Sequence, residues 1–352
     1  MSRTIQSNQA RNKAIVAIIT VINQDTPGRV KCMNDTKDKR DGRVVVVGST
    51  NWDIAMYLPS LPQPGETVAN GRLQTGLGGK GANQAVAAHR AGGVDTVFLS
   101  CIGDDDIAVS VQQVFTSLEM TIPYVAEVTD TGTGSACIFV NAEGENCIGV
   151  ASGANSAVDR VFVHSHETLI SEAQIVLAQL EIPLESIEAL AEICSRSPAT
   201  FVLNPAPAVP LTDALLAQVD VLTPNEGELS QLSGMPVTDD MALQSAARSL
   251  CNKGVGTVIV TLGPRGCLIV TASSAEFVAG LNVDTVDTTA AGDVFNGALV
   301  AEIIRGQSLS AAAATACKAA ALAVMSRGAI ASIPTRKQVL AFALLADSSA
   351  HL

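Results

Sequence analysis

Short apolar runs that alternate with helical patterns dominate the chain from residue 43 onward. Residues 44–47 are four consecutive valines, a pattern typical of a strand buried on both faces of a parallel sheet. Repeated strand–helix units predict an α/β fold, a doubly wound, mainly parallel sheet flanked by helices. Further strands are expected at 96–101, 175–180, 201–204, 219–222, 257–261 and 267–270, and helices at 104–120, 184–194 and from 290, 308 and 335.

Two regions, about 51–75 and 134–150, lack this alternation. The first suggests short strands at 54–58 and 61–67 joined by a proline turn. The second suggests a hairpin, 134–140 with 146–150, across a turn that contains Gly144. Because no helices separate these strands, we expect them to form a small separate β-sheet that acts as a lid.

Composition narrows the class of protein. The net charge of −12 argues against a nucleic-acid partner, because phosphate backbones are bound through clustered Lys and Arg. No apolar run reaches the ~18 residues of a membrane span. The eight cysteines are scattered, mostly in apolar segments such as 98–101 and 137–139. This usage predicts core positions in a reducing compartment, such as the cytoplasm, rather than disulfides or a zinc site.

Residues 1–42 differ from residues 43–352, which we interpret as one domain. Basic residues outnumber acidic ones in this N-terminal extension, which would suit an organelle transit peptide. The alternatives are a disordered tail, or a true start at Met33. The acidic residues Asp35, Asp38 and Asp41 favour the alternatives.

The stretch 287–297 is the strongest candidate for chemistry. Val283 and Val286 are expected to end an extended segment before it. The stretch itself is interpreted as a loop that becomes a helix, with three small residues, Ala290, Ala291 and Gly292, just before Asp293. Free N–H groups at a helix N-terminus form an anion site. Asp293 is then either a helix cap or the base that accepts the proton of an attacking hydroxyl in phosphoryl transfer.

A second glycine-rich segment, 76–83, satisfies the G-x-G-x-x-G pattern. The match to a dinucleotide-binding loop is weak, because polar residues precede it where a buried strand is required. The segment is therefore either a turn before a core helix or a ligand loop in which Lys80 and Asn83 face a polar group.

Polar residues also gather where predicted strands end. Since α/β sheets bind ligands at the carboxyl ends of their strands, this distribution favours an active site there. The residues concerned are Asn51, Asp53, Glu181, Asn225, Glu228, Gly263 and Asp293.

With these motifs in place, the chain resembles the ribokinase-like family of carbohydrate kinases over about residues 43–340. Residues 78–85 match the first signature of that family, and 287–297 match the second, which is specific to it. The segments 64–67, 139–146, 179–181, 203–208, 223–226 and 261–263 match in the same order.

The resemblance implies ATP-dependent phosphorylation of D-ribose at its primary (O5) hydroxyl. Asp293 would be the general base, and Ala290, Ala291 and Gly292 would form the anion hole. Residues implied to hold the sugar are Asn51, Asp53, Gly79, Lys80, Asn83, Glu181 and Asp293. Residues implied to line the ATP site are Asn225, Thr261, Leu262, Gly263, Pro264, Arg265, Gly266, Gly292 and Cys317. The small sheet would also form a homodimer contact.

The resemblance further implies two kinds of metal ion. Glu228 would lie near the Mg²⁺–phosphate shell. A monovalent cation, K⁺, would bind at Asp287, Thr289, Ala323, Ser326, Gly328 and Ser332. Pro264 and Cys317 depart from the pattern of the family, which leaves the nucleotide preference open.

Competing functions remain at this point. A kinase for another sugar, such as deoxyribose or a ketohexose, comes second, and a catalytically inactive sugar-binding regulator comes third. The intact Asp293 and the small residues before it argue against the regulator. A nicotinamide dehydrogenase rests only on the G-x-G-x-x-G match.

Overall fold

The computed structural model describes residues 42–349 of the chain. The interpretations of the N-terminal extension and of Met33 as the start fall on residues outside this range and stay predictions. The cellular location also stays a prediction. Among the described residues, no helix is long and apolar enough to cross a membrane.

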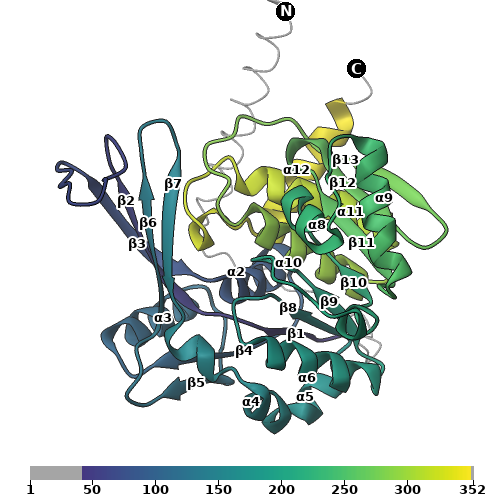
Figure 1. The fold of residues 1–352 in the computed structure, drawn as a ribbon, viewed down its shortest axis with the longest axis horizontal. Coiled ribbons are helices and arrows are strands. Elements are labelled where there is room, and N and C mark those ends of the chain that lie inside the picture. Colours follow the sequence, from purple (N-terminus) through teal and green to yellow (C-terminus); the bar gives the residue numbers. More distant parts are fainter. Residues whose placement is uncertain (1–41, 350–352) are drawn as a thin grey trace, which may run out of the picture.

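A nine-stranded sheet forms the centre of the molecule (Figure 1). Its order is β13-β12-β11-β10-β9-β8-β1-β4-β5. The pairs from β5 to β11 are parallel, and only the β11–β12 and β12–β13 pairs are antiparallel. The predicted mainly parallel, doubly wound sheet is confirmed. The strands are β1 Val44–Val47, β4 Thr96–Gly103, β5 Val125–Val128, β8 Ile175–Ala178, β9 Thr200–Leu203, β10 Val221–Leu222, β11 Thr257–Thr261, β12 Gly266–Val270 and β13 Ala275–Ala279.

Helices cover both faces of this sheet, and the alternation of side chains along β1 shows how. Val45 and Val47 pack into one hydrophobic cluster, and Val44 and Val46 into another on the opposite face. The first cluster contains residues of α4 Arg160–Ser165, α5 Glu167–Ser171, α6 Leu184–Ser195, α7 Asp213–Leu216, α8 Glu226–Ser233 and α9 Asp240–Asn252. The second contains residues of α2 Lys80–Val86, the π-helix η1 Ala87–Gly92, α3 Asp106–Ser117, α10 Ala291–Ile304, α11 Leu309–Ala323 and α12 Arg336–Ser349.

The second, smaller sheet has four strands in the order β3-β2-β6-β7, and Figure 1 shows it standing out from the body of the molecule. The predicted hairpin is present as β6 and β7, but no strand occurs at 61–67. The partner of β2 comes later, because the proline-rich segment 58–71 makes an irregular loop. The strands are β2 Asn51–Tyr57, β3 Arg72–Gly78, β6 Gly134–Val140 and β7 Asn146–Ala151.

Other expectations are corrected by the structure. Of the two interpretations of the glycine-rich segment, the turn before a core helix holds and the ligand loop does not: β3 ends at Gly78, and α2, whose residues 81–86 are buried, begins at Lys80. The segment Val283–Val286, expected to be extended, contains no strand. Cys137, assigned to the core, is exposed, because it lies on a strand of the small sheet, much of which no other described element covers.

Candidate active site

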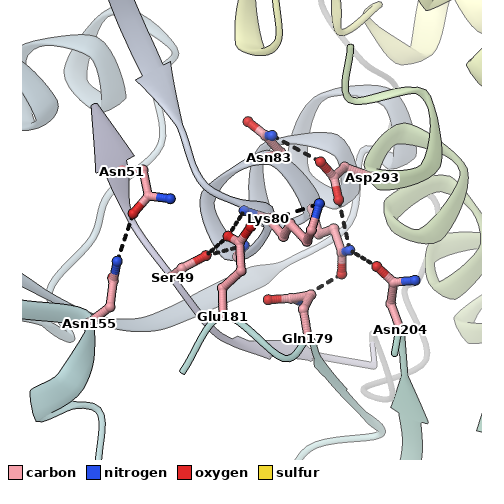
Figure 2. A network of polar contacts seen from close by, with 11 residues as sticks. Ser49, Asn51, Lys80, Asn83, Asn155, Gln179, Glu181, Asn204 and Asp293 are labelled. Atoms are coloured by element: carbon pink, nitrogen blue, oxygen red, sulfur yellow. Dashed lines mark hydrogen bonds and ion pairs between the residues drawn. The ribbon is translucent and has the colours of Figure 1, made fainter. Parts of the chain in front are cut away.

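Asp293 lies in the first turn of α10 and is only 7% exposed. The N-cap of this helix is Ala290, in the left-handed conformation with φ 60°, and its side chain makes no capping bond. The Asp293 carboxylate instead accepts hydrogen bonds from Asn83 Nδ2 and Gln84 Nε2, each at 2.9 Å. The helix-cap interpretation therefore does not describe Asp293, which points toward α2 rather than to its own helix end (Figure 2).

The N-terminus of α10 offers hydrogen-bond donors next to Asp293. The N–H groups of Gly292 and Asp293 have no acceptor within residues 42–349, whereas the N–H of Ala291 donates to the carbonyl oxygen of Thr288 at 3.2 Å. The donors that could meet an anion are thus Gly292 and Asp293. Ala290 and Ala291 contribute small side chains, and the left-handed Ala290 turns the chain into the helix.

Glycine-dependent packing holds α2 against the chain that follows β1. A Cβ on Gly81 would lie 2.4 Å from the backbone nitrogen of Ser49, and one on Gly79 would lie 2.7 Å from that of Asn51. Gly79 also has φ 87°, which disfavours any other residue. Since β3 pairs antiparallel within the small sheet, the G-x-G-x-x-G match is not part of a parallel βαβ unit, and the dehydrogenase interpretation loses its basis.

Lys80 is the charged group that this packing brings into the site. Its Nζ lies 3.8 Å from Glu181 Oε1, and its backbone N–H donates to Glu181 Oε2 at 2.9 Å. Ser49 Oγ donates to the same oxygen at 2.6 Å (Figure 2). Burial alone would lower the pKa of Lys80, but the nearby charges of Asp293, Glu181, Glu228 and Asp53 outweigh it and raise that pKa. Lys80 is therefore positively charged at neutral pH.

Burial raises the pKa of two carboxyl groups near Lys80, those of Asp53 and Asp293. Burial is the main reason why the pKa of Asp53 is raised to about 7, with further increases from the charges of Glu181 and Asp293 and a decrease from Lys80. Burial also raises the pKa of Asp293, although Lys80 and the donors Gln84 and Asn83 oppose it. The Asp53 carboxylate has room because residue 78 is glycine: a Cβ on Gly78 would come within 2.1 Å of a carboxylate oxygen.

Asn51, the first residue of β2, is held by a residue that we did not predict. Asn155 Nδ2 donates to Asn51 Oδ1 at 2.7 Å, and Asn155 Oδ1 accepts the N–H of Thr50 at 2.8 Å. These bonds fix the turn between β1 and β2 (Figure 2). Asn51 and Asp53 therefore lie on a strand of the small sheet, beyond the carboxyl end of β1.

Two cavities adjoin this constellation. The larger, about 890 Å³, lies between the small sheet and the segments 285–289 and 327–331, and Asp53, Asp287 and Gly328 contribute to its lining. The second, about 580 Å³, lies beside the N-terminus of α10 and includes Ala291 and Gly292 in its lining. Thr285 and Thr288 line both cavities, so the irregular segment before α10 forms their common wall.

The second cavity contains most of the residues proposed for the nucleotide: Asn225, Thr261, Gly263, Pro264, Gly266, Gly292 and Cys317. Its remaining walls are largely apolar, with Leu281, Val283, Phe295 and Val324. Leu262 and Arg265 lie outside its lining. Leu262 is buried in the core, and the Arg265 guanidinium turns to Glu226 at 2.6 Å and Asp240 at 2.9 Å.

The residues proposed for metal ions lie in two places. Asn225 and Glu228 form a capping box at the start of α8, in which each side chain accepts the backbone N–H of the other residue at 2.8 Å. Burial raises the pKa of Glu228 despite the Asn225 bond and the charge of Lys80. Among the described residues, no group of three His, Cys, Asp or Glu could hold a metal ion by itself.

Asp287 joins the wall of the larger cavity to the segment after α11. Its carboxylate accepts the N–H and hydroxyl of Thr289 at 2.9 and 2.6 Å, and the N–H of Gly328 at 2.9 Å. Burial would raise the pKa of Asp287, but these bonds and Arg327 lower it. Of the other proposed cation ligands, Ala323 and Ser332 are buried. The Ala323 carbonyl accepts the N–H of Ser326 at 3.0 Å.

Three buried amides near Asp293 received no role in the sequence analysis: Gln84, Gln179 and Asn204. All three were inside segments that matched the family, and Gln179 and Asn204 follow β8 and β9 directly. The rule that flagged polar residues at strand ends could have found these two. Gln84 carried a different signal, a polar residue within an otherwise small and apolar helix face.

The family assignment follows from comparison with known proteins. A model of the pfkB family of carbohydrate kinases matches residues 41–336. This chain belongs to the pfkB family of carbohydrate kinases. A ribokinase of Haemophilus influenzae is 40% identical over 299 residues, covering 85% of this chain and 97% of the relative. A deoxyribokinase of Salmonella typhimurium is 35% identical over 296 residues, 84% and 96% of the two chains.

Solved structures agree with this assignment. The structure of Arabidopsis thaliana ribokinase complexed with ribose and ATP has a TM-score of 0.80 and 32% identity, and the match covers 86% of this chain and 98% of that one. As a carbohydrate kinase, this protein takes a sugar and ATP as its substrates, which fits the presence of two cavities near the start of α10.

The raised pKa of Asp53 gives a testable effect on stability. For a carboxyl group whose folded pKa of about 7 lies above its ordinary value of 3.8, ionisation destabilises the folded state as pH rises between these values. Asp53→Asn should therefore raise the melting temperature of the sugar-free kinase at pH 8, by about 2 °C or more, and much less at pH 5. Thermal denaturation at both pH values measures the difference.

The control is Asp106→Asn, which changes an exposed carboxylate on α3. It should give no gain that depends on pH. If Asp53→Asn changes the melting temperature equally at pH 5 and pH 8, burial does not raise the pKa of Asp53.

Proposed function

We propose that this carbohydrate kinase transfers the γ-phosphoryl group of ATP to the primary O5 hydroxyl of D-ribose, giving ribose 5-phosphate and ADP. One observation carries the proposal. The buried carboxylate of Asp293 stands in the first turn of α10 beside N–H groups that have no acceptor among the described residues, and the two cavities that share Thr285 and Thr288 lie near this helix start.

The proposed step uses these groups in order. Asp293 accepts the proton of O5, O5 forms a bond to the γ-phosphorus, and the bond from that phosphorus to the β,γ-bridging oxygen breaks, so that ADP leaves. The N–H groups of Gly292 and Asp293 and the positive Lys80 would stabilise the charge that develops on the phosphoryl oxygens. The segment 261–266 and Asn225 would hold the rest of the nucleotide.

Ribose is favoured over other sugars by the relatives and by Asp53. An ionised carboxylate only accepts hydrogen bonds, and its two oxygens suit two neighbouring hydroxyls. Asn51, Asn83, Glu181 and the chain at Gly79 would complete the sugar site. The second candidate is a kinase for 2-deoxyribose, because a deoxyribokinase is nearly as similar in sequence as the ribokinases.

Mg²⁺ fits this site as a partner of ATP rather than as a resident ion. Mg²⁺ is commonly held by one or two carboxylates together with phosphate oxygens and water. Glu228 is a half-buried carboxylate next to Asn225, Glu226 and Gly227, which line the nucleotide cavity. We assign Glu228 to the shell of that ion, whose chemistry would be to neutralise phosphate charge.

K⁺ fits the segment around Asp287. The lowered pKa of this residue keeps its carboxylate negative, and the N–H groups of Val286 and Asp287 donate to Val324 O at 2.8 and 3.1 Å, which ties this segment to the end of α11. Carbonyl groups of Ala323, Ser326, Gly328 and Ser332, with Thr289, would complete the coordination. The ion would order the wall just before α10 without contact to the sugar.

The small sheet is proposed to act as a lid and as the contact of a homodimer. Its two outer strands, β3 and β7, each have an edge without a partner strand in the described chain, and unpaired edges favour pairing with another chain. Leu73 is 58% exposed, Ile148 53% and Val150 58%. Burial of these apolar side chains against a second copy would stabilise the dimer.

The identity of the sugar is tested by comparing kcat/KM for ribose and 2-deoxyribose. A sugar without one hydroxyl leaves a buried acceptor of Asp53 unpaired, so ribose should be preferred by at least ~10-fold, equivalent to ~1.4 kcal/mol. Asp53→Ala should reduce activity on ribose far more than on deoxyribose and narrow the gap. If the wild type treats both sugars alike, ribose gives way to the second candidate.

The base is tested with Asp293→Asn, which keeps the size of the side chain. Turnover should fall by on the order of 10²–10⁴-fold, while ATP binding measured by calorimetry stays close to wild type. A purified variant that retains a third or more of the wild-type kcat would remove Asp293 from the role of base.

The cation is tested at constant ionic strength. Replacing tetramethylammonium by K⁺ should raise kcat by about fivefold or more, an effect equivalent to about 1 kcal/mol. Asp287→Ala should blunt this response, while the control Asp95→Ala, on the surface beside Arg43, should keep it. Equal rates in the two salts would contradict the proposed K⁺ site.

A further inference from the structure

A chain of buried side-chain amides ends on the oxygen of Asp293 that faces away from Asn83. Gln179 Nε2 donates to Gln84 Oε1 at 2.6 Å. Gln84 Nε2 donates both to Asp293 Oδ1 and to Asn204 Oδ1, each at 2.9 Å. Asn204 Nδ2 donates to the backbone carbonyl of Thr223 at 2.9 Å. Figure 2 shows Gln179 and Asn204 on the side of Asp293 opposite to Asn83.

The direction of these bonds follows from their last member. An amide can present either its oxygen or its nitrogen, but the carbonyl of Thr223 can only accept. Asn204 must therefore turn its NH₂ to Thr223 and its oxygen to Gln84. Gln84 must then turn its NH₂ to Asn204, and the same NH₂ reaches Asp293. One backbone carbonyl thus fixes a donor against Oδ1 of Asp293.

The anchor of the chain is tied back to α10. Thr223 Oγ1 donates to Asn296 Oδ1 at 2.6 Å, and Asn296 Nδ2 donates to the carbonyl of Gly292 at 2.9 Å. Gly292 precedes Asp293. The bonds therefore form a closed circuit that runs from Asp293 through Gln84, Asn204, Thr223 and Asn296 back to the first turn of the same helix.

The two oxygens of Asp293 differ in how firmly their donors are held. Gln84 is fully buried and is bonded at both ends of its amide. Asn83 donates to Oδ2 at 2.9 Å, but its own buried Oδ1 has no partner within the described residues. Asn83 is thus free to exchange Oδ2 for a ligand, whereas Gln84 is not free to leave Oδ1.

We propose that Gln84, oriented by Asn204, is a positioning residue that keeps Oδ1 of Asp293 an acceptor, so that the proton of the sugar hydroxyl is taken up on Oδ2. This inference rests on the proposed function, in which Asp293 is the base. A proton on Oδ1 would face the N–H of Gln84, so protonation there is disfavoured. The same bond counteracts the effect of burial on the pKa of Asp293.

The test is the pH dependence of kcat with saturating ribose and ATP. Gln84→Met removes the donor while keeping the length of the side chain. A hydrogen bond to a charged group is worth roughly one pKa unit or more, so the acid limb of the profile should move up by about one pH unit. Asn204→Leu frees the orientation of Gln84 without removing its donor, and its shift should be smaller. KM for ribose should change less than kcat.

One control and one further variant separate positioning from general damage to the fold. Gln218→Met makes the same change on the surface, at a residue whose amide donates to Ala214 O, and should leave the profile unmoved. Gln179→Met, which removes the donor to Gln84 Oε1, should give a shift of the same sign. If Gln84→Met does not fold, Gln179→Met and Asn204→Leu still test the inference.

A second measurement needs no turnover. Loss of the donor raises the pKa of Asp293 in the folded state, so Gln84→Met should lower the melting temperature more at pH 8 than at pH 5. In the Asp293→Asn background this pH dependence should disappear. The inference would be overturned if the wild type is active but the variants lose kcat equally at every pH and their melting temperatures fall equally at pH 5 and pH 8. The proposed function would then still stand. Failure to phosphorylate any sugar would overturn the proposed function alone, and the melting data would still decide the role of Gln84.

Discussion

The electrostatic interaction of four carboxylates with one lysine lies at the centre of this kinase, and most of the surrounding packing and hydrogen bonding stabilises it. Asp53, Glu181, Glu228 and Asp293 all act on the charge of Lys80, which alone cannot neutralise them. The excess negative charge is tolerable only because each carboxylate has its own hydrogen-bond donors or a raised pKa. Lys80 itself depends on backbone contacts that only glycine permits at Gly79 and Gly81. A site of this kind is organised to receive additional positive charge or hydroxyl groups.

The buried strands and the mainly parallel class of the sheet could be predicted from the sequence, because both follow from short apolar runs that alternate with helical patterns. The valines 44–47 and the run 257–261 are apolar on both faces, and both became central strands. The small sheet was predicted less well, because its strands are half exposed and one of them, β3, is polar and glycine-rich. The segment Val283–Val286 does not form the strand that its apolar residues suggest: Val283 lines the second cavity, and Val286 is 54% exposed.

For the candidate site too, the residues with a local sequence signal were predicted and those that depend on distant contacts were not. Residues at strand ends and helix starts, such as Asp293 and Glu181, were found because their position alone is informative. Arg265 was placed with the nucleotide because of its neighbours in sequence, but ion pairs with Glu226 and Asp240 decide its direction. Gln84 was missed for a related reason. The hydrogen bonds that give it a role connect α2 to residues more than a hundred positions away, and no local pattern contains them.

The raised pKa of Asp53 also links sugar binding to the surrounding solvent. Burial raises the pKa of this carboxyl group to about 7, so near neutral pH part of the sugar-free protein holds a proton there that an exposed aspartate would have lost. Hydroxyl groups that donate to Asp53 favour the ionised form, so binding expels that proton into the buffer. The heat of binding would then contain the ionisation heat of the buffer, and the apparent affinity would weaken as the medium becomes more acidic. The affinity of the kinase for its sugar would therefore depend on the pH of the surrounding medium, independently of the phosphoryl-transfer step.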